Sequence, residues 1–251
     1  MDNMIYKDYI DSKYINELEK LHEQKLLLKS LIDLKQINDP LIIELSGLPR
    51  TGKTTTFEQL YDFFKKGGFN IIKIKEPAYL IKQSLNLEEL KNLSDVEFND
   101  KTLEISRNSL IEAKQIGADI IIMDRGIIDN FFWYQLYFDK NLIDKDNYDK
   151  YMKKLYEDIK LLDKLFVLTA STNKIITRDY NSSIYLEKRN KKNKENIEQL
   201  ARAYNHLSTK LIEHYNDLII VDTTYMSSKD TSIYIASESI KTYQKKINSR
   251  I

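Results

Sequence analysis

Short apolar runs alternate along the chain with longer segments in which apolar residues recur every three to four positions. The apolar runs lie at 41–45, 69–74, 118–123, 165–168 and 218–221. Short, wholly apolar runs are typical of strands buried on both faces, and the spacing between them is typical of helices. The pattern predicts an α/β fold in three layers: a five-stranded parallel sheet with helices on both faces.

The segments between the apolar runs are predicted as helices. Gly67 and Gly68 end the helix after the first run as a left-handed C-cap does, and Gly117 ends a later one. The expected helices cover about 53–66, 102–115, 126–162 (mostly helical), 172–216 (two helices) and 228–246, with an irregular helical stretch at 79–100.

Residues 1–38 are predicted as helix, which Asp39-Pro40 ends. Helical spacing of apolar and aromatic residues is seen at Ile10, Tyr14, Leu18 and Leu21. We therefore divide the chain into an N-terminal helical extension, 1–40, and a main domain, 41–251. We expect a helix or helical hairpin packed on the domain; a dimer contact, giving a homodimer, and a regulatory arm are the alternatives.

The amino-acid composition excludes several kinds of catalytic and metal site. The 251 residues contain no cysteine, which excludes disulfides, cysteine-bound zinc, iron–sulfur clusters and thiol catalysis. The 3 histidines are scattered, so a histidine metal site is not expected. A net charge of +1 provides no global attraction to nucleic acid or an anionic membrane. With neither a signal peptide nor an apolar span recognised, we expect a cytoplasmic protein.

A phosphate-binding motif follows the first apolar run. Residues Gly47, Leu48, Pro49, Arg50, Thr51, Gly52, Lys53 and Thr54, with Thr55 after them, fit G-x-x-x-x-G-K-[ST]. Such a loop directs backbone N–H groups and a helix N-terminus at phosphate oxygens, and its lysine adds a positive charge. The motif predicts binding of ATP or GTP with Mg²⁺, held by the Thr54 hydroxyl.

Two charged motifs close later strands: Lys75-Glu76-Pro77 the second, and Asp124-Arg125-Gly126 the third. Ligands of open parallel sheets bind beyond the carboxyl ends of the strands, so these side chains are expected near the transferred phosphate. Asp124 could hold Mg²⁺, and Arg125 could neutralise phosphate charge or hold Glu76. A solvated acid at Glu76 and a surface ion pair at Asp124-Arg125 are the alternatives.

The motifs resemble those of the thymidylate kinase and deoxynucleoside kinase branch of P-loop kinases, over about residues 41–245. The resemblance lies in 46–53, similar to E-G-L-D-R-A-G-K, in Glu76-Pro77, similar to the family's E-P, and in Asp124-Arg125, similar to its D-R or E-R. It implies the three-layer fold of P-loop NTPases. Two departures weaken the match to a thymidine acceptor: Pro49 replaces an acid of the loop, and Ala78-Tyr79-Leu80 replaces G-G-T.

The resemblance also implies residues that bind the acceptor. Asp129 takes the place of a family serine, and Trp133 that of an aromatic residue on which a base could stack. Arg107 lies about one turn out of register with the family's phosphate-binding arginine. Glu76 completes the expected substrate-binding set. A place for Trp133 in the core is the alternative.

A mobile lid over the phosphates is implied for about 178–197. Arg178 resembles the arginine that opens the family's lid, and Asp222-Thr223-Thr224 ends the last strand, where the family's adenine pocket lies. The lid would carry Lys188, Arg189, Lys191, Lys192 and Lys194. Its closure would bring cations onto the phosphates and exclude water; a solvated basic loop is the alternative.

The sequence therefore favours an ATP- and Mg²⁺-dependent phosphotransferase with a small-molecule acceptor, a nucleoside or nucleoside monophosphate. The expected catalytic residues are Lys53, Arg50, Glu76, Asp124, Arg125 and Arg178, with Thr54 and Asp124 holding the metal. The alternatives are a kinase of another hydroxyl, such as an antibiotic or sugar, a kinase of a nucleic-acid 5′-hydroxyl, and a nucleotide-binding switch.

Overall fold

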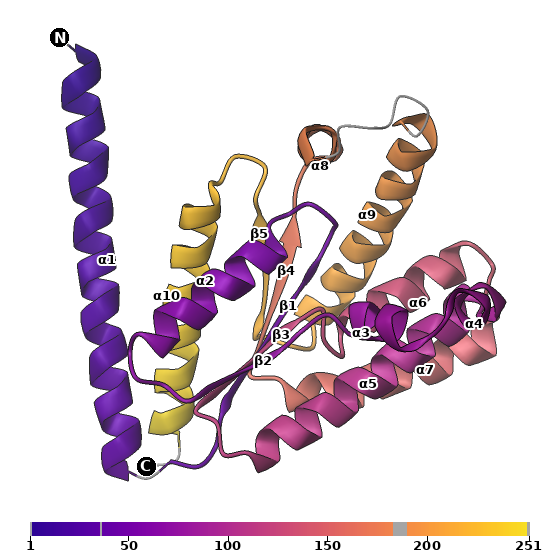
Figure 1. Ribbon diagram of the computed structural model, residues 1–251, viewed down its shortest axis with the longest axis horizontal. Coiled ribbons are helices and arrows are strands. Elements are labelled where there is room, and N and C mark those ends of the chain that lie inside the picture. The colour runs from indigo at the N-terminus through magenta and orange to yellow at the C-terminus, as the bar shows by residue number, and fades with distance from the viewer. Residues whose placement is uncertain (1, 36, 183–189, 250–251) are drawn as a thin grey trace.

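The computed structural model describes residues 2–35, 37–182 and 190–249 (Figure 1). Within them, five parallel strands form one sheet in the order β2-β3-β1-β4-β5. The strands are β1 (Leu41–Gly47), β2 (Ile71–Ile74), β3 (Ile120–Asp124), β4 (Lys164–Thr169) and β5 (Leu218–Asp222). β1 and β3 are buried at every position, which explains why their sequences, LIIELSG and IIIMD, are mainly apolar.

The register of the sheet brings the functional motifs to one edge. Leu45 of β1 lies opposite Asp124 of β3, and Gly47 of β1 lies opposite Leu168 of β4. The carboxyl ends of the three strands therefore meet, and the loops that follow them share the crevice where ligands of such sheets bind.

One face of the sheet is covered by α2 (Lys53–Lys65) and α10 (Ser228–Asn248), with α1 (Asp2–Lys35) outside them (Figure 1). Phe57, Phe64, Phe166 and Ile240 belong to the apolar core on this side. Burial of such side chains is the main source of stability for an interior of this kind.

The opposite face is covered by α5 (Asp95–Gln115), α6 (Asp129–Asp139), α7 (Lys145–Asp158) and α9 (Asn190–Ile212). A second core there contains Leu110, Ile121, Phe131, Leu155 and Tyr204. The shorter elements α3 (Pro77–Ser84), α4 (Leu87–Asn92), the 3₁₀ turn η1 (Ile159–Leu161) and α8 (Thr172–Ser182) connect the layers. The predicted three-layer α/β fold is confirmed.

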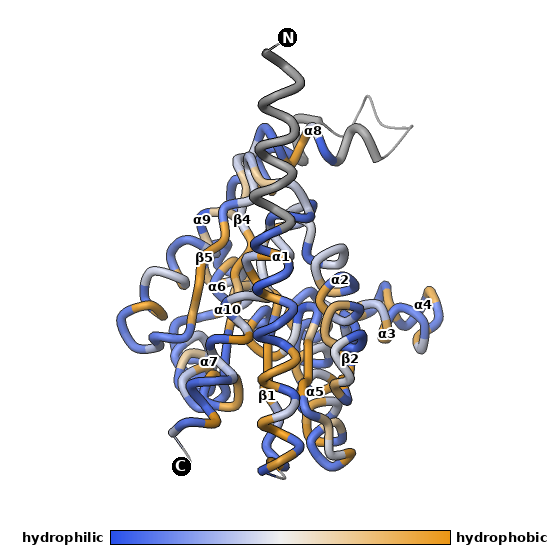
Figure 2. The backbone as a smooth tube through the Cα atoms, turned by 90° about the vertical axis from the view of Figure 1, so that its left-hand side faces the viewer, coloured by the Kyte–Doolittle hydropathy of each residue, from blue (hydrophilic) through white to orange (hydrophobic). Residues whose placement is uncertain are grey.

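The N-terminal helix packs on the domain through one face (Figures 1 and 2). Leu28 and Ile32 are buried, and the buried Lys25 donates from Nζ to the backbone oxygen of Phe63, 2.9 Å away, near the end of α2. On the outer side Leu27 and Leu34 are 65% and 82% exposed. The contact of α1 with the domain agrees with the packed-helix expectation; a dimer role and the boundary at residue 40 stay predictions.

No helix among the residues that the structure describes has the length and apolar character to cross a membrane.

Candidate active site

The loop between β1 and α2 has the backbone conformation of a phosphate cradle. Gly47, Arg50 and Gly52 have φ of 132°, 59° and 92°, in the left-handed region. The Thr51 hydroxyl donates to the oxygen of Leu48 at 2.7 Å and closes the turn. No side chain caps α2, so its first N–H groups stay available to a phosphate.

Gly47 is required where the loop leaves the sheet. A Cβ at this position would lie 2.1 Å from the backbone oxygen of Leu168. We expect Gly47→Ala to lower the free energy of unfolding by more than about 2 kcal/mol, because backbone atoms of β1 and β4 would have to separate. Gly117→Ala is the matched control: it also has positive φ, but a Cβ there meets open space, so the expected cost is about 1 kcal/mol. Urea denaturation measures both; equal losses would contradict the prediction.

Lys53 is held inside the loop. Its Nζ donates to the backbone oxygens of Gly47 and Leu48 at 3.0 and 2.6 Å, and the residue is only 6% exposed. Burial, followed by the neighbouring Arg125, lowers the pKa of Lys53 to about 7. A phosphate placed in the loop would supply the negative charge that favours the protonated ammonium.

Thr54 and Asp124 form a pair suited to magnesium. The Thr54 hydroxyl donates to Asp124 Oδ2 at 3.0 Å, while the buried Asp124 Oδ1 has no hydrogen-bond partner. Burial raises the pKa of Asp124 against the opposing influence of Lys53. A hard cation would satisfy the unpaired oxygen, so the residues fit Mg²⁺. Nowhere in the described part do three or more His, Asp or Glu side chains form a metal site, so nucleotide oxygens would complete the coordination.

Arg125 lies between two carboxylates. Its Nε is 3.4 Å from Glu76 Oε1, and its NH1 is 2.8 Å from Asp129 Oδ2. Burial lowers the pKa of Arg125, but the charge of Asp129 outweighs it and the net shift is upward. Glu76 is 43% exposed at its side chain and Arg125 only 14%, so Glu76 is the more accessible partner.

Glu44 is a site residue that the sequence analysis missed. This acid in the middle of β1 is fully buried and accepts from the backbone N–H groups of Ile128 and Asp129 at 2.9 and 2.7 Å. Burial raises the pKa of Glu44 to about 8. Glu44 thereby fixes the start of α6 and the position of Asp129. An acid inside the otherwise apolar run 41–45 was the signal that could have identified it.

Arg178 contacts both the phosphate loop and the residue that follows β5. Its guanidinium donates to the backbone oxygen of Arg50 at 3.1 Å and to the backbone oxygen of Thr223 at 2.7 Å. It therefore joins the phosphate loop to the end of β5. Of the expected lid, residues 183–189, including Lys188 and Arg189, lie outside the described residues, as do the side chains of Lys191 and Lys192. Lys194 pairs with Glu198 at 3.9 Å.

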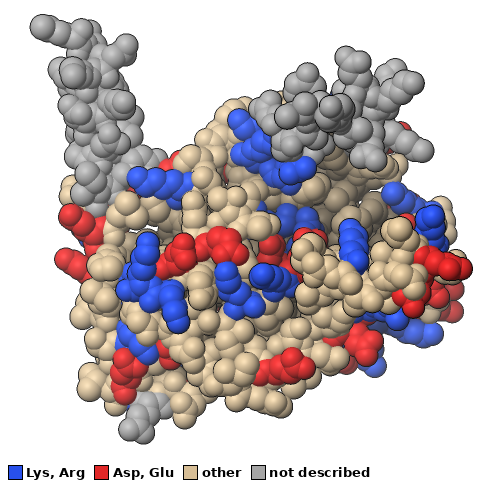
Figure 3. All heavy atoms as spheres, viewed as in Figure 1, with Lys and Arg blue, Asp and Glu red and all other residues tan. Residues whose placement is uncertain are grey.

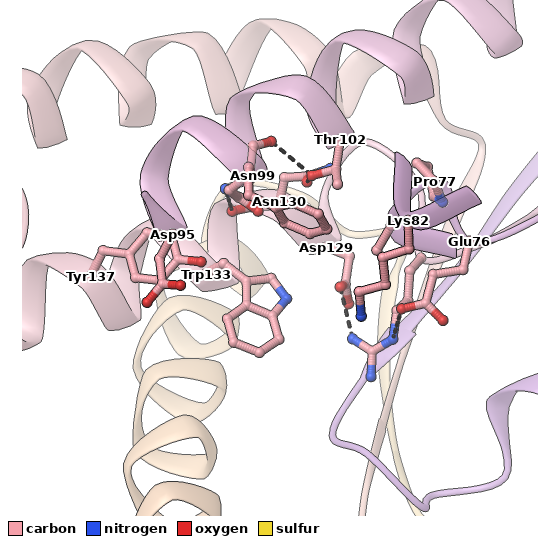
Figure 4. Close-up of a pocket in the computed structure, with 13 residues that line it drawn as sticks. Glu76, Pro77, Lys82, Asp95, Asn99, Thr102, Asp129, Asn130, Trp133 and Tyr137 are labelled. Atoms are coloured by element: carbon pink, nitrogen blue, oxygen red, sulfur yellow. Dashed lines mark hydrogen bonds and ion pairs between the residues drawn. The ribbon is translucent and has the colours of Figure 1, made fainter. Parts of the chain in front are cut away.

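A cavity of about 260 Å³ opens beside Arg125 (Figure 4). At one end lie Glu76, Lys82 and Asp129; Trp133 stands in the middle, and Asp95 and Tyr137 lie at the other end (Figure 4). The remaining wall consists of Pro77, Ala78, Phe98, Asn99, Thr102 and Asn130. The cavity thus combines the partly exposed carboxylate of Glu76, a flat aromatic surface and buried amides.

Six of the predicted residues lie together, whereas Arg107 lies apart from them. Lys53, Thr54, Asp124, Arg125, Glu76 and Asp129 gather around the carboxyl ends of β1, β2 and β3. Trp133 lines the cavity of Figure 4 and also a second one of about 410 Å³, which Pro49 and Arg50 border. Arg107 is not brought to the cavity: its guanidinium pairs with Asp158 of α7, because its position on α5 faces that helix.

Comparisons with known proteins support the fold. Two structures of deoxyadenosine kinase from M. mycoides, one with dATP and one with dCMP and a flexible dCDP, are similar to this chain with TM-scores of 0.54 and 0.53. They are 21% and 23% identical to it and cover 80% and 83% of it, and the match spans 100% of each. No curated protein matches the chain. These similarities establish a shared P-loop fold.

A family model described as an AAA domain matches residues 42–227. The match begins in β1, includes the phosphate loop and both charged motifs, and ends just before α10. It covers most of the chain, from the first strand of the sheet through the last. On the loop geometry, the sheet order and this match, the chain belongs to the AAA domain family of P-loop nucleotide-binding proteins.

Proposed function

We propose that the protein transfers the γ-phosphoryl group of ATP, bound with Mg²⁺, to a nucleoside or nucleoside monophosphate. One observation carries the proposal: the cavity of Figure 4 opens directly beside Arg125 and Glu76, at the edge of the sheet that holds the phosphate loop. A protein that only bound and released a nucleotide would need no such second chamber. The fold shared with a deoxyadenosine kinase supports a nucleoside acceptor.

The donor half of the site neutralises charge. Lys53 and the backbone N–H groups of the loop would bind the β- and γ-phosphates, and Arg178 would cover them from the side of β5. Bound Mg²⁺, held by Thr54 and Asp124, would neutralise charge on the phosphate oxygens. The positioning of these cations does most of the work, because phosphoryl transfer requires little covalent chemistry from the protein.

The acceptor half of the site would supply a general base and hold the acceptor next to the phosphate loop. With a hydroxyl acceptor, its oxygen forms the new bond to the γ-phosphorus, the bond to the bridging oxygen of ADP breaks, and the hydroxyl proton passes to Glu76. Arg125 lies next to Glu76 and would neutralise the phosphoryl oxygens. The acceptor must reach between Glu76 and the loop, which is the end of the cavity where Lys82 and Asp129 also lie.

Trp133 would bind the flat part of the acceptor. We expect Trp133→Ala to raise KM for the acceptor about 10-fold while KM for ATP changes less than 2-fold, because stacking on an aromatic side chain contributes about 1–3 kcal/mol per base. Tyr234→Ala, on an exposed position of α10 (41% exposed), is the control for loss of an aromatic side chain. An unchanged acceptor KM would remove Trp133 from the proposed site.

The proposal is tested with an acceptor panel. The purified protein is incubated with Mg²⁺ and ATP, or GTP, against nucleosides, nucleoside monophosphates, aminoglycosides, sugars and a single-stranded oligonucleotide, and products are identified by mass spectrometry. We expect product with nucleosides or their monophosphates. On the face drawn in Figure 3, basic and acidic side chains are interspersed, which favours a small acceptor over a nucleic acid. Product in another class alone would overturn the assignment of the acceptor.

A further inference from the structure

The carboxylate of Asp129 connects three separate parts of the fold. Its Oδ1 accepts from the Ser46 hydroxyl at 2.5 Å, from the Tyr204 hydroxyl at 2.7 Å and from the Gly47 N–H at 3.3 Å. Its Oδ2 binds Arg125. Because both oxygens are occupied and the residue is 3% exposed, Asp129 is better suited to hold Arg125 than to contact an acceptor.

Tyr204 brings the helix α9 into this group. Its ring stacks on Phe132 with 4.2 Å between centroids and an angle of 5° between planes, and the residue is 1% exposed. Its hydroxyl also lies 3.4 Å from NH1 of Arg125. The stack fixes the ring, so the hydroxyl has little freedom except to move together with α9.

We propose that Tyr204 is a positioning residue that transmits the placement of α9 to the Arg125 guanidinium through Asp129. Arg178, on the preceding helix α8, contacts the phosphate loop through the backbone oxygen of Arg50. Tyr204, on α9, contacts Asp129. The helix α9 is thereby connected to the arginine beside Glu76. This inference rests on the proposed phosphotransfer and adds how the site is held ready for it.

If Tyr204 positions Arg125, its loss should slow turnover without weakening the binding of ATP. Among the described residues, Arg125 pairs with Glu76 and Asp129 and lies beside the Tyr204 hydroxyl. Its side chain makes no hydrogen bond to the phosphate loop there, so its orientation should affect the transfer step more than the binding of ATP. A charged hydrogen-bonded group that loses one of its supports samples more positions, and misplacement near the reacting atoms lowers the rate steeply.

Tyr204→Phe tests the inference, because it removes the hydroxyl and keeps the stacked ring. We expect kcat to fall about 10-fold, with less than a 2-fold change in KM for ATP. Tyr215→Phe is the matched control: its hydroxyl donates to the backbone oxygen of Leu162 at 3.1 Å, away from Arg125, and kcat should stay within 2-fold of the unmodified protein. A kcat for Tyr204→Phe within 2-fold of the control would overturn the inference.

A double-mutant cycle with Asp129→Asn separates positioning from general loss of structure. If Tyr204 acts through Asp129, Tyr204→Phe should cost less than 2-fold in kcat once Asp129 is replaced. Additive losses, or a loss that only follows a lowered thermal midpoint, would contradict the coupling. Asp129→Asn alone is the second variant: because Asp129 holds Arg125 directly, its kcat should fall at least as far as that of Tyr204→Phe, and a smaller fall counts equally against the inference. Absence of any phosphotransfer by the unmodified protein would instead refute the proposed function.

Discussion

Glu76→Gln is expected to lower phosphotransfer to a hydroxyl acceptor by a factor of about 10² to 10⁴, with ATP binding unchanged. Glutamine keeps the shape of the side chain and removes the group that accepts the proton. The ion pair of Glu76 with Arg125 is lost as well, but Asp129 still holds the guanidinium from its other side. In the proposed site the nucleotide phosphates bind at the loop and not at Glu76, so affinity for ATP should persist.

The same substitution distinguishes two classes of acceptor. A phosphate acceptor, with a second pKa of about 6, is already mostly deprotonated at neutral pH and needs no base. Glu76→Gln should therefore weaken transfer to a nucleoside monophosphate only a few-fold. Steady-state rates with a nucleoside and with its monophosphate measure the difference. Glu112→Gln, an exposed acid on α5, is the control; equal, small losses for both acceptors would reject Glu76 as the base.

Lys53→Ala is expected to lower kcat by a factor of about 10³ or more for every acceptor. Lys53 is the cation inside the phosphate loop, and charge neutralisation on the γ-phosphoryl group is the main part of catalysis in proteins of this kind. The fold should persist, because among the described residues the Lys53 ammonium donates hydrogen bonds only to backbone oxygens of the loop itself and takes no part in either apolar core.

Lys65→Ala is the matched control for that experiment, since it removes a lysine from the exposed far end of the same helix α2. Its kcat should equal that of the unmodified protein. Circular dichroism of both variants checks folding. A Lys53→Ala protein that is folded and retains more than about a tenth of the activity would show that the loop lysine is not the principal cation.

The sheet could be predicted from the sequence because each strand is mainly apolar and bounded by clear turn residues. Helix ends were less exact: α5 begins at Asp95, where Ser94 and Glu97 form a capping box, seven residues before the expected start. The box has the S-x-x-E pattern that marks a helix start. It was not recognised because the apolar residues after it are irregularly spaced.

Motifs placed the site more accurately than isolated residues did. The loop, Glu76 and Asp124-Arg125 share an edge of the sheet because register fixes where strands end. Arg107 was predicted from its position in a family helix alone, and the rotation of that helix directs it to Asp158. Glu44 and Tyr204 were missed as partners of Asp129, because their role depends on contacts between residues more than 70 positions apart in the chain.

The fate of the γ-phosphoryl group tests the central claim most directly. ³¹P NMR of a reaction that contains the protein, Mg²⁺, ATP and a mixture of deoxynucleosides and their monophosphates follows the group as it leaves ATP. The proposal predicts that ADP appears together with an equal amount of a new phosphorylated acceptor, and that Lys53→Ala abolishes both signals. ADP accompanied only by inorganic phosphate, at the same rate with and without acceptors, would contradict the proposal and identify the protein as a nucleotide hydrolase.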